Sequence, residues 1–163
     1  MWDSIRLPDT LAPYRGALER IDGPVERALD VGTGTGAGAQ VIKERFPTTE
    51  VVGVDVSPAM LEAARRNVDG VSFREGDAAK LPFGDGEFDL VAHSNMIPFL
   101  DEVARVLRPG GWTFFAFSGG SETPIYVPPE RLRRELERRG FTDFAEIAAG
   151  RGTAVLARRG NPH

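Results

Sequence analysis

A glycine-rich turn and an acidic residue stand where the sequence can bind a small ligand. Residues 30–36 (DVGTGTG) close an apolar stretch, and Asp55 closes the next one, 19 residues after Gly36. Glycines allow a tight turn and a close approach of a ligand to the backbone. A helix that follows such a turn offers free N–H groups to a negatively charged group. The carboxylate of Asp55 can accept hydrogen bonds from both hydroxyls of a ribose.

A second acidic residue follows the third apolar stretch, in Gly76-Asp77-Ala78. The carboxylate of Asp77 can accept a hydrogen bond from an adenine amino group. The N–H of Ala78 can reach a ring nitrogen of the same base. Together with the glycine-rich turn and Asp55, these residues predict a site for an adenosine-containing molecule.

His93 is the only histidine apart from His163, and it is expected to end the fourth strand. A histidine there is usually a structural residue with a hydrogen-bond partner, and a general base is the alternative. We therefore identify no catalytic residue from the sequence.

Apolar runs that alternate with helical patterns must position these residues. The runs predict strands at 26–31, 51–55, 71–75, 88–93, 112–117, 142–148 and 153–158, and helices at 37–46, 58–67, 98–107 and 129–139. Ser57 is expected to cap the second of these helices, and Pro109-Gly110-Gly111 to stop the third.

The alternation predicts an α/β fold of the doubly wound, Rossmann-like type. Strands separated by helices form a mostly parallel sheet with helices on both faces. The short link at 150–152 predicts that the last two of the seven strands are an antiparallel pair. Ligands bind beyond the carboxyl ends of the strands in such sheets, where Asp30, Asp55 and Asp77 are expected.

The bulk composition narrows the class of protein. The 163 residues fit a single domain (1–163), with an N-terminal helix or cap at 1–24 and a core at 25–160. The net charge of −4 argues against extensive nucleic-acid binding. With no cysteine and two histidines, no metal site is expected. No membrane span or signal peptide is recognised, so a cytoplasmic protein is expected.

Four segments resemble consecutive motifs of the class I S-adenosylmethionine-dependent methyltransferases, closest to those acting on small molecules. They are LDVGTGTG (29–36), VVGVDVSPAMLEAAR (51–65), GDAAKLPFGDGEFDLV (76–91) and VARVLRPGGW (103–112). The resemblance covers roughly residues 25–160. It implies S-adenosylmethionine as the cofactor and a small-molecule methyl acceptor, methylated on oxygen or nitrogen mainly through orientation of the reactants.

The resemblance also implies roles for the first two motifs. Gly32, Gly34 and Gly36 would line the methionine end of the cofactor, and Asp30 would hold their loop. Asp55 would bind the ribose hydroxyls.

The remaining cofactor contacts are implied in the same way. Val56 and Met60 would pack on the adenine, while Asp77 and Ala78 would read its edge. His93 would lie beside the methionine moiety and the transferable methyl group.

Two other functions remain open at this point. Gly32-x-Gly34-x-x-Ala37 also satisfies the loose fingerprint of a dinucleotide-binding domain. The Asp77 motif and the closing strand pair weigh against that function. The second alternative is a non-catalytic cofactor-binding or partner subunit, because the segment 118–130 is short for a substrate lid.

Several further residues have two interpretations. Tyr14 and Arg15 either fold over the cofactor on an N-terminal helix or lie at the surface. Trp2 and Leu11 offer apolar surface for a possible homodimer.

The arginine-rich segment 129–139 is interpreted as a solvated helix with ion pairs. Residues 94–99 (SNMIPF) only partly match the pattern of nucleic-acid amino-methylating enzymes, so base methylation is not inferred.

Overall fold

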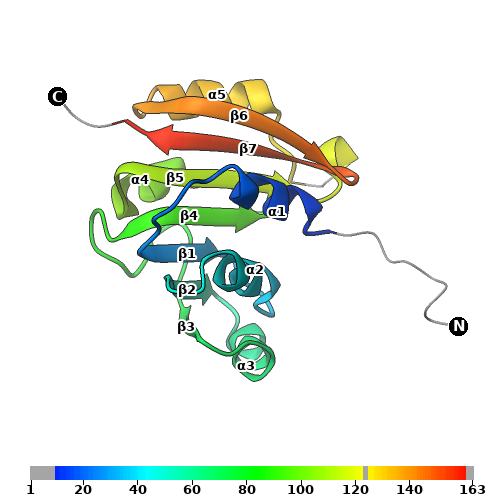
Figure 1. Cartoon of the computed structure of the whole chain (residues 1–163), viewed down its shortest axis with the longest axis vertical. Helices are drawn as coiled ribbons and strands as arrows, with labels where there is room; N and C mark the ends of the chain where they lie inside the picture. Colours follow the sequence, from blue (N-terminus) through cyan, green and yellow to red (C-terminus); the bar gives the residue numbers. More distant parts are fainter. Residues whose placement is uncertain (1–9, 123–124, 161–163) are drawn as a thin grey trace, which may run out of the picture.

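The computed structural model describes residues 10–122 and 125–160. In it, the buried apolar runs of the sequence form the seven strands of one sheet. The strands are β1 (Arg27–Val31), β2 (Glu50–Asp55), β3 (Val71–Glu75), β4 (Phe88–Ser94), β5 (Leu107–Phe117), β6 (Phe141–Ala149) and β7 (Gly152–Arg159). Their order across the sheet is β3-β2-β1-β4-β5-β7-β6 (Figure 1).

Strand direction follows from the connections. Neighbours are parallel from β3 to β5, and β7 is antiparallel to both β5 and β6. The predicted α/β fold, with a mostly parallel sheet and a closing antiparallel pair, is confirmed. The strand order reverses between β1 and β4, which is where doubly wound sheets bind ligands.

Helices cover both faces of the sheet (Figure 1). One face carries α1 (Ala12–Glu19), α2 (Ala37–Arg45) and α3 (Pro58–Asn67), and the other carries α4 (Leu100–Val106) and α5 (Pro129–Glu137). A short 3-10 helix, η2 (Gly120–Glu122), follows β5. None of these helices has the length and apolar character needed to cross a lipid bilayer.

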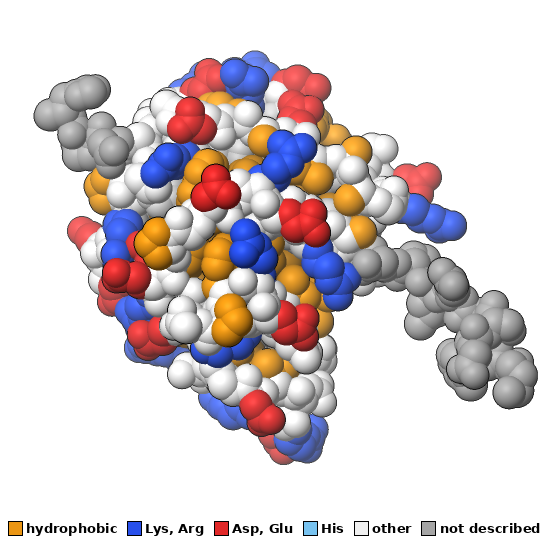
Figure 2. All heavy atoms as spheres, viewed as in Figure 1, with side chains coloured by type: hydrophobic (Ala, Val, Ile, Leu, Met, Phe, Trp, Pro, Cys, Tyr) orange, Lys and Arg blue, Asp and Glu red, His pale blue; other side chains and the backbone are white. Residues whose placement is uncertain are grey.

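The local signals at α3 and α5 act as expected. Ser57 caps α3, since its Oγ accepts a hydrogen bond from the Met60 N–H at 3.2 Å. Leu132 and Leu136 of α5 are buried, while arginine and glutamate side chains of the same helix pair with each other. On the face of the molecule shown in Figure 2, acidic and basic side chains are interspersed rather than separated by sign.

The boundary between α4 and β5 differs from the prediction. The helix ends at Val106, and Pro109-Gly110-Gly111 lies inside β5 instead of stopping the helix. Leu107 already pairs with Phe88 of β4, and the register then shifts. Gly110 has a φ of +84°, and a Cβ at Gly111 would lie 2.9 Å from the Asp89 carbonyl oxygen. The glycines therefore allow an irregularity in the pairing of β4 and β5, where the two backbones approach each other closely.

A buried polar cluster joins α1 to the loop after β1. Tyr14 is fully buried, and its hydroxyl donates a hydrogen bond to Asp30 Oδ1 at 2.8 Å. Thr33 Oγ1 donates to Asp30 Oδ2, also at 2.8 Å. The Tyr14 ring lies edge-on to Phe114, and a Cβ at Gly38 of α2 would approach that ring to 2.9 Å. The cluster thus fixes α1 and α2 against the loop.

The N-terminal residues named from the sequence fall in different places. Tyr14 is neither a surface residue nor a cover over a ligand, because it packs into the core, whereas Arg15 is exposed. Leu11 is half-buried against the same core cluster. Trp2 lies outside the described residues.

We expect Tyr14→Phe to lower the free energy of unfolding by about 1–3 kcal/mol, because a buried carboxylate loses a donor. Chemical denaturation followed by circular dichroism measures this change. Tyr126→Phe is the matched control, since the Tyr126 ring packs at 5.5 Å from the Phe117 ring and its hydroxyl makes no hydrogen bond to the described residues. Equal losses in the two variants would contradict the role of the Tyr14 hydroxyl.

Candidate functional site

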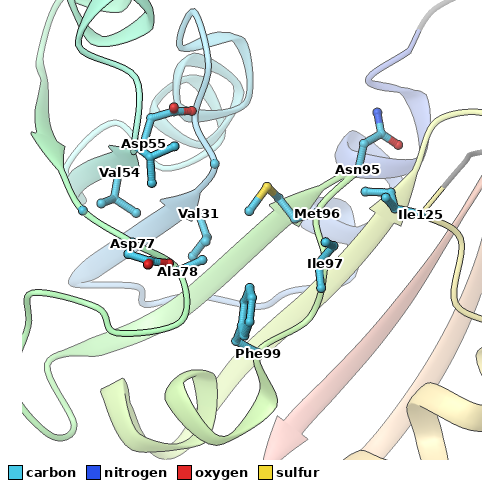
Figure 3. A pocket seen from close by; sticks show the side chains of 13 residues that line it. Val31, Val54, Asp55, Asp77, Ala78, Asn95, Met96, Ile97, Phe99 and Ile125 are labelled. Carbon is cyan, nitrogen blue, oxygen red and sulfur yellow. The ribbon is translucent and has the colours of Figure 1, made fainter.

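A cavity of about 330 Å³ opens at the carboxyl ends of β1, β2 and β4 (Figure 3). Its size is at the lower end of the range for small-molecule sites, which starts at about 300 Å³. Its walls are mostly apolar and come from five segments of the chain: Val31, Gly32, Val54, Asp55, Val56, Gly76, Asp77, Ala78, Asn95, Met96, Ile97, Phe99 and Ile125.

Half of the residues predicted from the sequence lie in this wall. Gly32, Asp55, Val56, Asp77 and Ala78 line the cavity. Five predicted residues lie outside the lining: Asp30, Gly34, Gly36, Met60 and His93.

The three glycines of the loop have different tasks. All three have positive φ, of +69° at Gly32, +54° at Gly34 and +92° at Gly36, and this backbone conformation favours glycine. Only Gly32 faces the cavity. A Cβ at Gly34 would meet nothing within 4 Å, whereas one at Gly36 would lie 2.9 Å from Val68 and 3.1 Å from Phe73. Gly36 therefore allows α2 to pack closely.

Asp55 connects the ends of β1 and β2. Its Oδ2 accepts a hydrogen bond from the Gly34 N–H, and its Oδ1 accepts one from the Ser57 N–H, both at 2.9 Å. Each carboxylate oxygen can accept more than one hydrogen bond. The half-exposed side chain can thus hold the loop and also bind hydroxyl groups of a ligand.

Asp77 and Val56 continue the wall that Asp55 begins. Asp77 is exposed in a turn, where its Oδ1 accepts the Ala79 N–H at 2.9 Å and its carbonyl accepts the Lys80 N–H at 3.0 Å. Figure 3 shows Asp55, Val54 and Asp77 along the same side of the cavity. Val56 is 66% exposed and lines the cavity, whereas Met60, at 45%, does not.

Asp30 supports the loop from below rather than facing the cavity. It is 3% exposed and holds the hydroxyls of Tyr14 and Thr33. Burial raises the pKa of Asp30 to about 6, and the two hydrogen bonds lower it in part.

His93 lies one position before the end of its strand, because β4 continues to Ser94. It is 2% exposed, its ring stacks on Phe115 at 4.1 Å, and its Nδ1 lies 3.0 Å from the Phe114 carbonyl oxygen. A carbonyl only accepts, so Nδ1 carries the proton. Burial lowers the pKa of His93 to about 4. The ring is therefore neutral and structural. Contrary to the expectation from the sequence, it does not line the cavity.

The segment after β4 supplies the wall that the sequence did not predict. Asn95 has a φ of +53°, and its Oδ1 accepts the Ser118 N–H while its Nδ2 donates to Ser118 Oγ, both at 2.9 Å. These bonds join the ends of β4 and β5. They also fix Met96 and Ile97, which line the cavity. Two weak signals stood in the sequence: an asparagine next to a strand end, which tolerates positive φ, and the partial motif match of residues 94–99.

Met96 closes the cavity over the glycine loop. Its side chain reaches across from the end of β4 toward Val31 and Asp55 (Figure 3). A Cβ at Gly32 would lie only 2.2 Å from the Met96 sulfur. A side chain at position 32 would therefore require the flexible Met96 thioether to move, and it would also be strained by the positive φ.

Among residues 10–122 and 125–160, no group of three or more histidine, aspartate or glutamate side chains is placed to hold a metal ion. The polar groups of the cavity are instead suited to hydroxyl, amino and ring-nitrogen groups of an organic ligand.

The comparison with known families decides what this arrangement belongs to. A family model described as "Methyltransferase domain" matches residues 28–111, about half of the chain and the part that carries Gly32, Asp55 and Asp77. The chain belongs to the class I S-adenosylmethionine-dependent methyltransferase family. The resemblance of the four motifs is thereby confirmed, and the dinucleotide-binding alternative is set aside.

The names of the curated relatives give varied substrates. This chain is 46% identical over 97 residues to a demethylmenaquinone methyltransferase of Thermus thermophilus, and the match covers 53% of this chain and 44% of that protein. It is 30% identical over 172 residues to a malonyl-[acyl-carrier protein] O-methyltransferase of Methylococcus capsulatus, covering 89% of this chain and 60% of that protein. The chain thus spans about half the length of these relatives.

A solved structure agrees with the fold of the methyltransferase domain. It is the putative methyltransferase in a complex with the Haloferax volcanii Trm112 methyltransferase activator, with a TM-score of 0.79 and 20% identity. The match covers 94% of this chain and 91% of that chain, so it includes the closing antiparallel strands.

The buried His93 makes the stability of the methyltransferase domain depend on pH. The pKa of His93 falls from 6.5 when unfolded to about 4 when folded. Between these values the unfolded chain binds a proton that the folded chain does not, so stability falls as the pH decreases. We expect His93→Gln, which keeps a donor for Phe114, to remove up to about 1.4 kcal/mol of this loss per pH unit.

Denaturation of both proteins between pH 7 and 4 measures this effect. Asp30 acts in the opposite sense, since its raised pKa gives stability that is lost as the pH rises toward about 6. Asp30 is present in both proteins, so the difference between them reports His93. Parallel stability curves would show that His93 does not stay neutral in the folded protein.

Proposed function

We propose that the cavity binds S-adenosylmethionine and that the domain transfers its methyl group to an oxygen or nitrogen atom of a small molecule. The position of Asp55 carries this proposal. Its carboxylate lies in the cavity wall at the end of β2, one strand away from the strand-order reversal, and is fixed by the backbone of Gly34 and Ser57. It keeps acceptor capacity for two ribose hydroxyls.

The other predicted residues in the wall extend the same binding mode. Asp77 and Ala78 would contact the adenine edge, and Val56 would pack on its face. Gly32 would lie at the methionine end, together with Met96. The thioether of Met96 is flexible and adapts its packing readily, so the contact with Gly32 is compatible with a bound ligand.

The cavity has the chemistry of a positioning site. When bound, S-adenosylmethionine supplies an electrophilic methyl group on a sulfonium. The apolar side chains of Val31, Met96, Ile97 and Phe99 would line that end, and orientation of the acceptor lowers the barrier. Asp55 and Asp77 are the only titratable side chains among the described residues of the wall, and both belong to the nucleoside side.

We expect Asp55→Ala to bind S-adenosylhomocysteine about ten- to a hundredfold more weakly than the unmodified protein, because hydrogen bonds to a charged group are lost. Isothermal titration calorimetry measures the affinity, with NAD titrated in parallel. Asp69→Ala is the control, since Asp69 is exposed and outside the cavity. Unchanged affinity in Asp55→Ala, or binding of NAD instead, would contradict the assignment.

Among the described residues, the cavity wall has no titratable side chain on the acceptor side, and this predicts which acceptors react. A hydroxyl that ionises readily can reach the site as its anion, whereas an aliphatic alcohol needs a base at the reacting atom. We expect carboxylic acids or phenols to be methylated faster than aliphatic alcohols of the same size. Formation of S-adenosylhomocysteine measures the rates. Equal rates would overturn this expectation, and binding without any turnover would favour the non-catalytic subunit.

A further inference from the structure

A second cavity lies beside the first, between α4 and α5. Its volume is about 490 Å³. Ile97 lines both cavities, so the two cavities are neighbours at the segment that follows β4. The lining of the second cavity is Ile97, Pro98, Leu100, Val127, Arg131, Leu132, Glu135 and Arg139.

The floor of this second cavity is apolar. Leu100 of α4 is 9% exposed and Leu132 of α5 is 1% exposed. Pro98 and Val127 are half-buried beside them. A ligand in this groove would therefore gain by burying an apolar body.

The charged side chains along the groove differ in whether they have an ion-pair partner. Arg139 is engaged, because its Nε donates to Asp101 at 2.8 Å and its guanidinium also contacts the Glu135 carboxylate at 3.3 Å. Glu135 pairs in addition with Arg138 at 3.3 Å. Arg131 is exposed, and its side chain has no ion-pair or hydrogen-bond partner among the described residues.

We propose that this groove holds the distal part of the methyl acceptor, with Arg131 binding an anionic group at the end remote from the methylated atom. The inference rests on the proposed methyl transfer in the first cavity. An unpaired guanidinium beside apolar side chains complements a carboxylate or phosphate on an apolar body. Because Ile97 is exposed and borders both cavities, such a molecule would cross this residue to reach Arg131 from the first cavity. The acceptor class is thus an elongated, apolar, anionic small molecule.

Three probes of equal chain length test the groove: decanoate, decyl phosphate and decanol. Each is titrated calorimetrically into the unmodified protein and into Arg131→Ala. Decanoate or decyl phosphate is expected to bind about tenfold more weakly to the variant, because a charge-assisted contact is lost. Decanol is expected to bind equally to both. The anion that depends more strongly on Arg131 identifies the acceptor's charged group.

Arg134→Ala is the matched control, since it removes the same charge from α5 at an exposed position outside the groove. It is expected to leave all three affinities unchanged. Arg131→Lys is expected to recover part of the anion binding. Val127→Trp, which fills the groove, is expected to weaken decanol and decanoate alike.

Anion binding that is unchanged in Arg131→Ala, or weakened equally in Arg134→Ala, would overturn the inference. Decanol binding that is unchanged in Val127→Trp would also overturn it. S-adenosylhomocysteine, titrated into every variant, separates this result from the proposed function. If S-adenosylhomocysteine binds normally while the affinities of the probes are the same with and without Arg131, only the groove assignment fails. If it does not bind the unmodified protein, the proposed function fails whatever the probes show.

Discussion

The hydrogen bond from the Gly34 N–H to the Asp55 carboxylate holds two strand ends in one place. Asp30 supports the same loop from the interior through Thr33 and Tyr14. Together the two carboxylates satisfy donors that a glycine-rich turn would otherwise leave unpaired. The cavity wall from Gly32 to Asp77 has its shape because this loop cannot move away from β2.

The two carboxylates differ because their surroundings differ. Asp30 is enclosed by α1, α2 and the sheet, so its charged form is costly and its pKa rises to about 6. Asp55 is half-exposed at the cavity, where a ligand can reach it. One acid therefore serves the fold, while the other is available for recognition. Each acid follows from its own short motif, and only the burial around each decides its role.

The sequence was sufficient for the sheet and for one side of the site. Period, spacing and turn residues predicted the strands and located Asp55 and Asp77. The opposite side was missed for two reasons. The bonds of Asn95 to Ser118 join positions 23 apart in the chain, and no local pattern reveals such a contact. His93 also pairs with Phe115 of the neighbouring strand β5, and the two rings stack. The sequence does not show which residues pair across two strands, so the burial of His93 behind the cavity wall was not predicted.

The N-terminal helix has a consequence for the order in which the domain is completed. α1 precedes every strand in the chain, yet it packs across β5, β6 and β7, and Gly16 lies against Ile147 of β6. Such contacts between distant parts of the sequence form late, because a long loop must close before they stabilise anything. During synthesis, α1 leaves the ribosome before all seven strands, but its contacts with β6 and β7 cannot form until those strands have been made. The complete packing of α1, which buries Tyr14, is therefore reached only after nearly the whole sheet has been made.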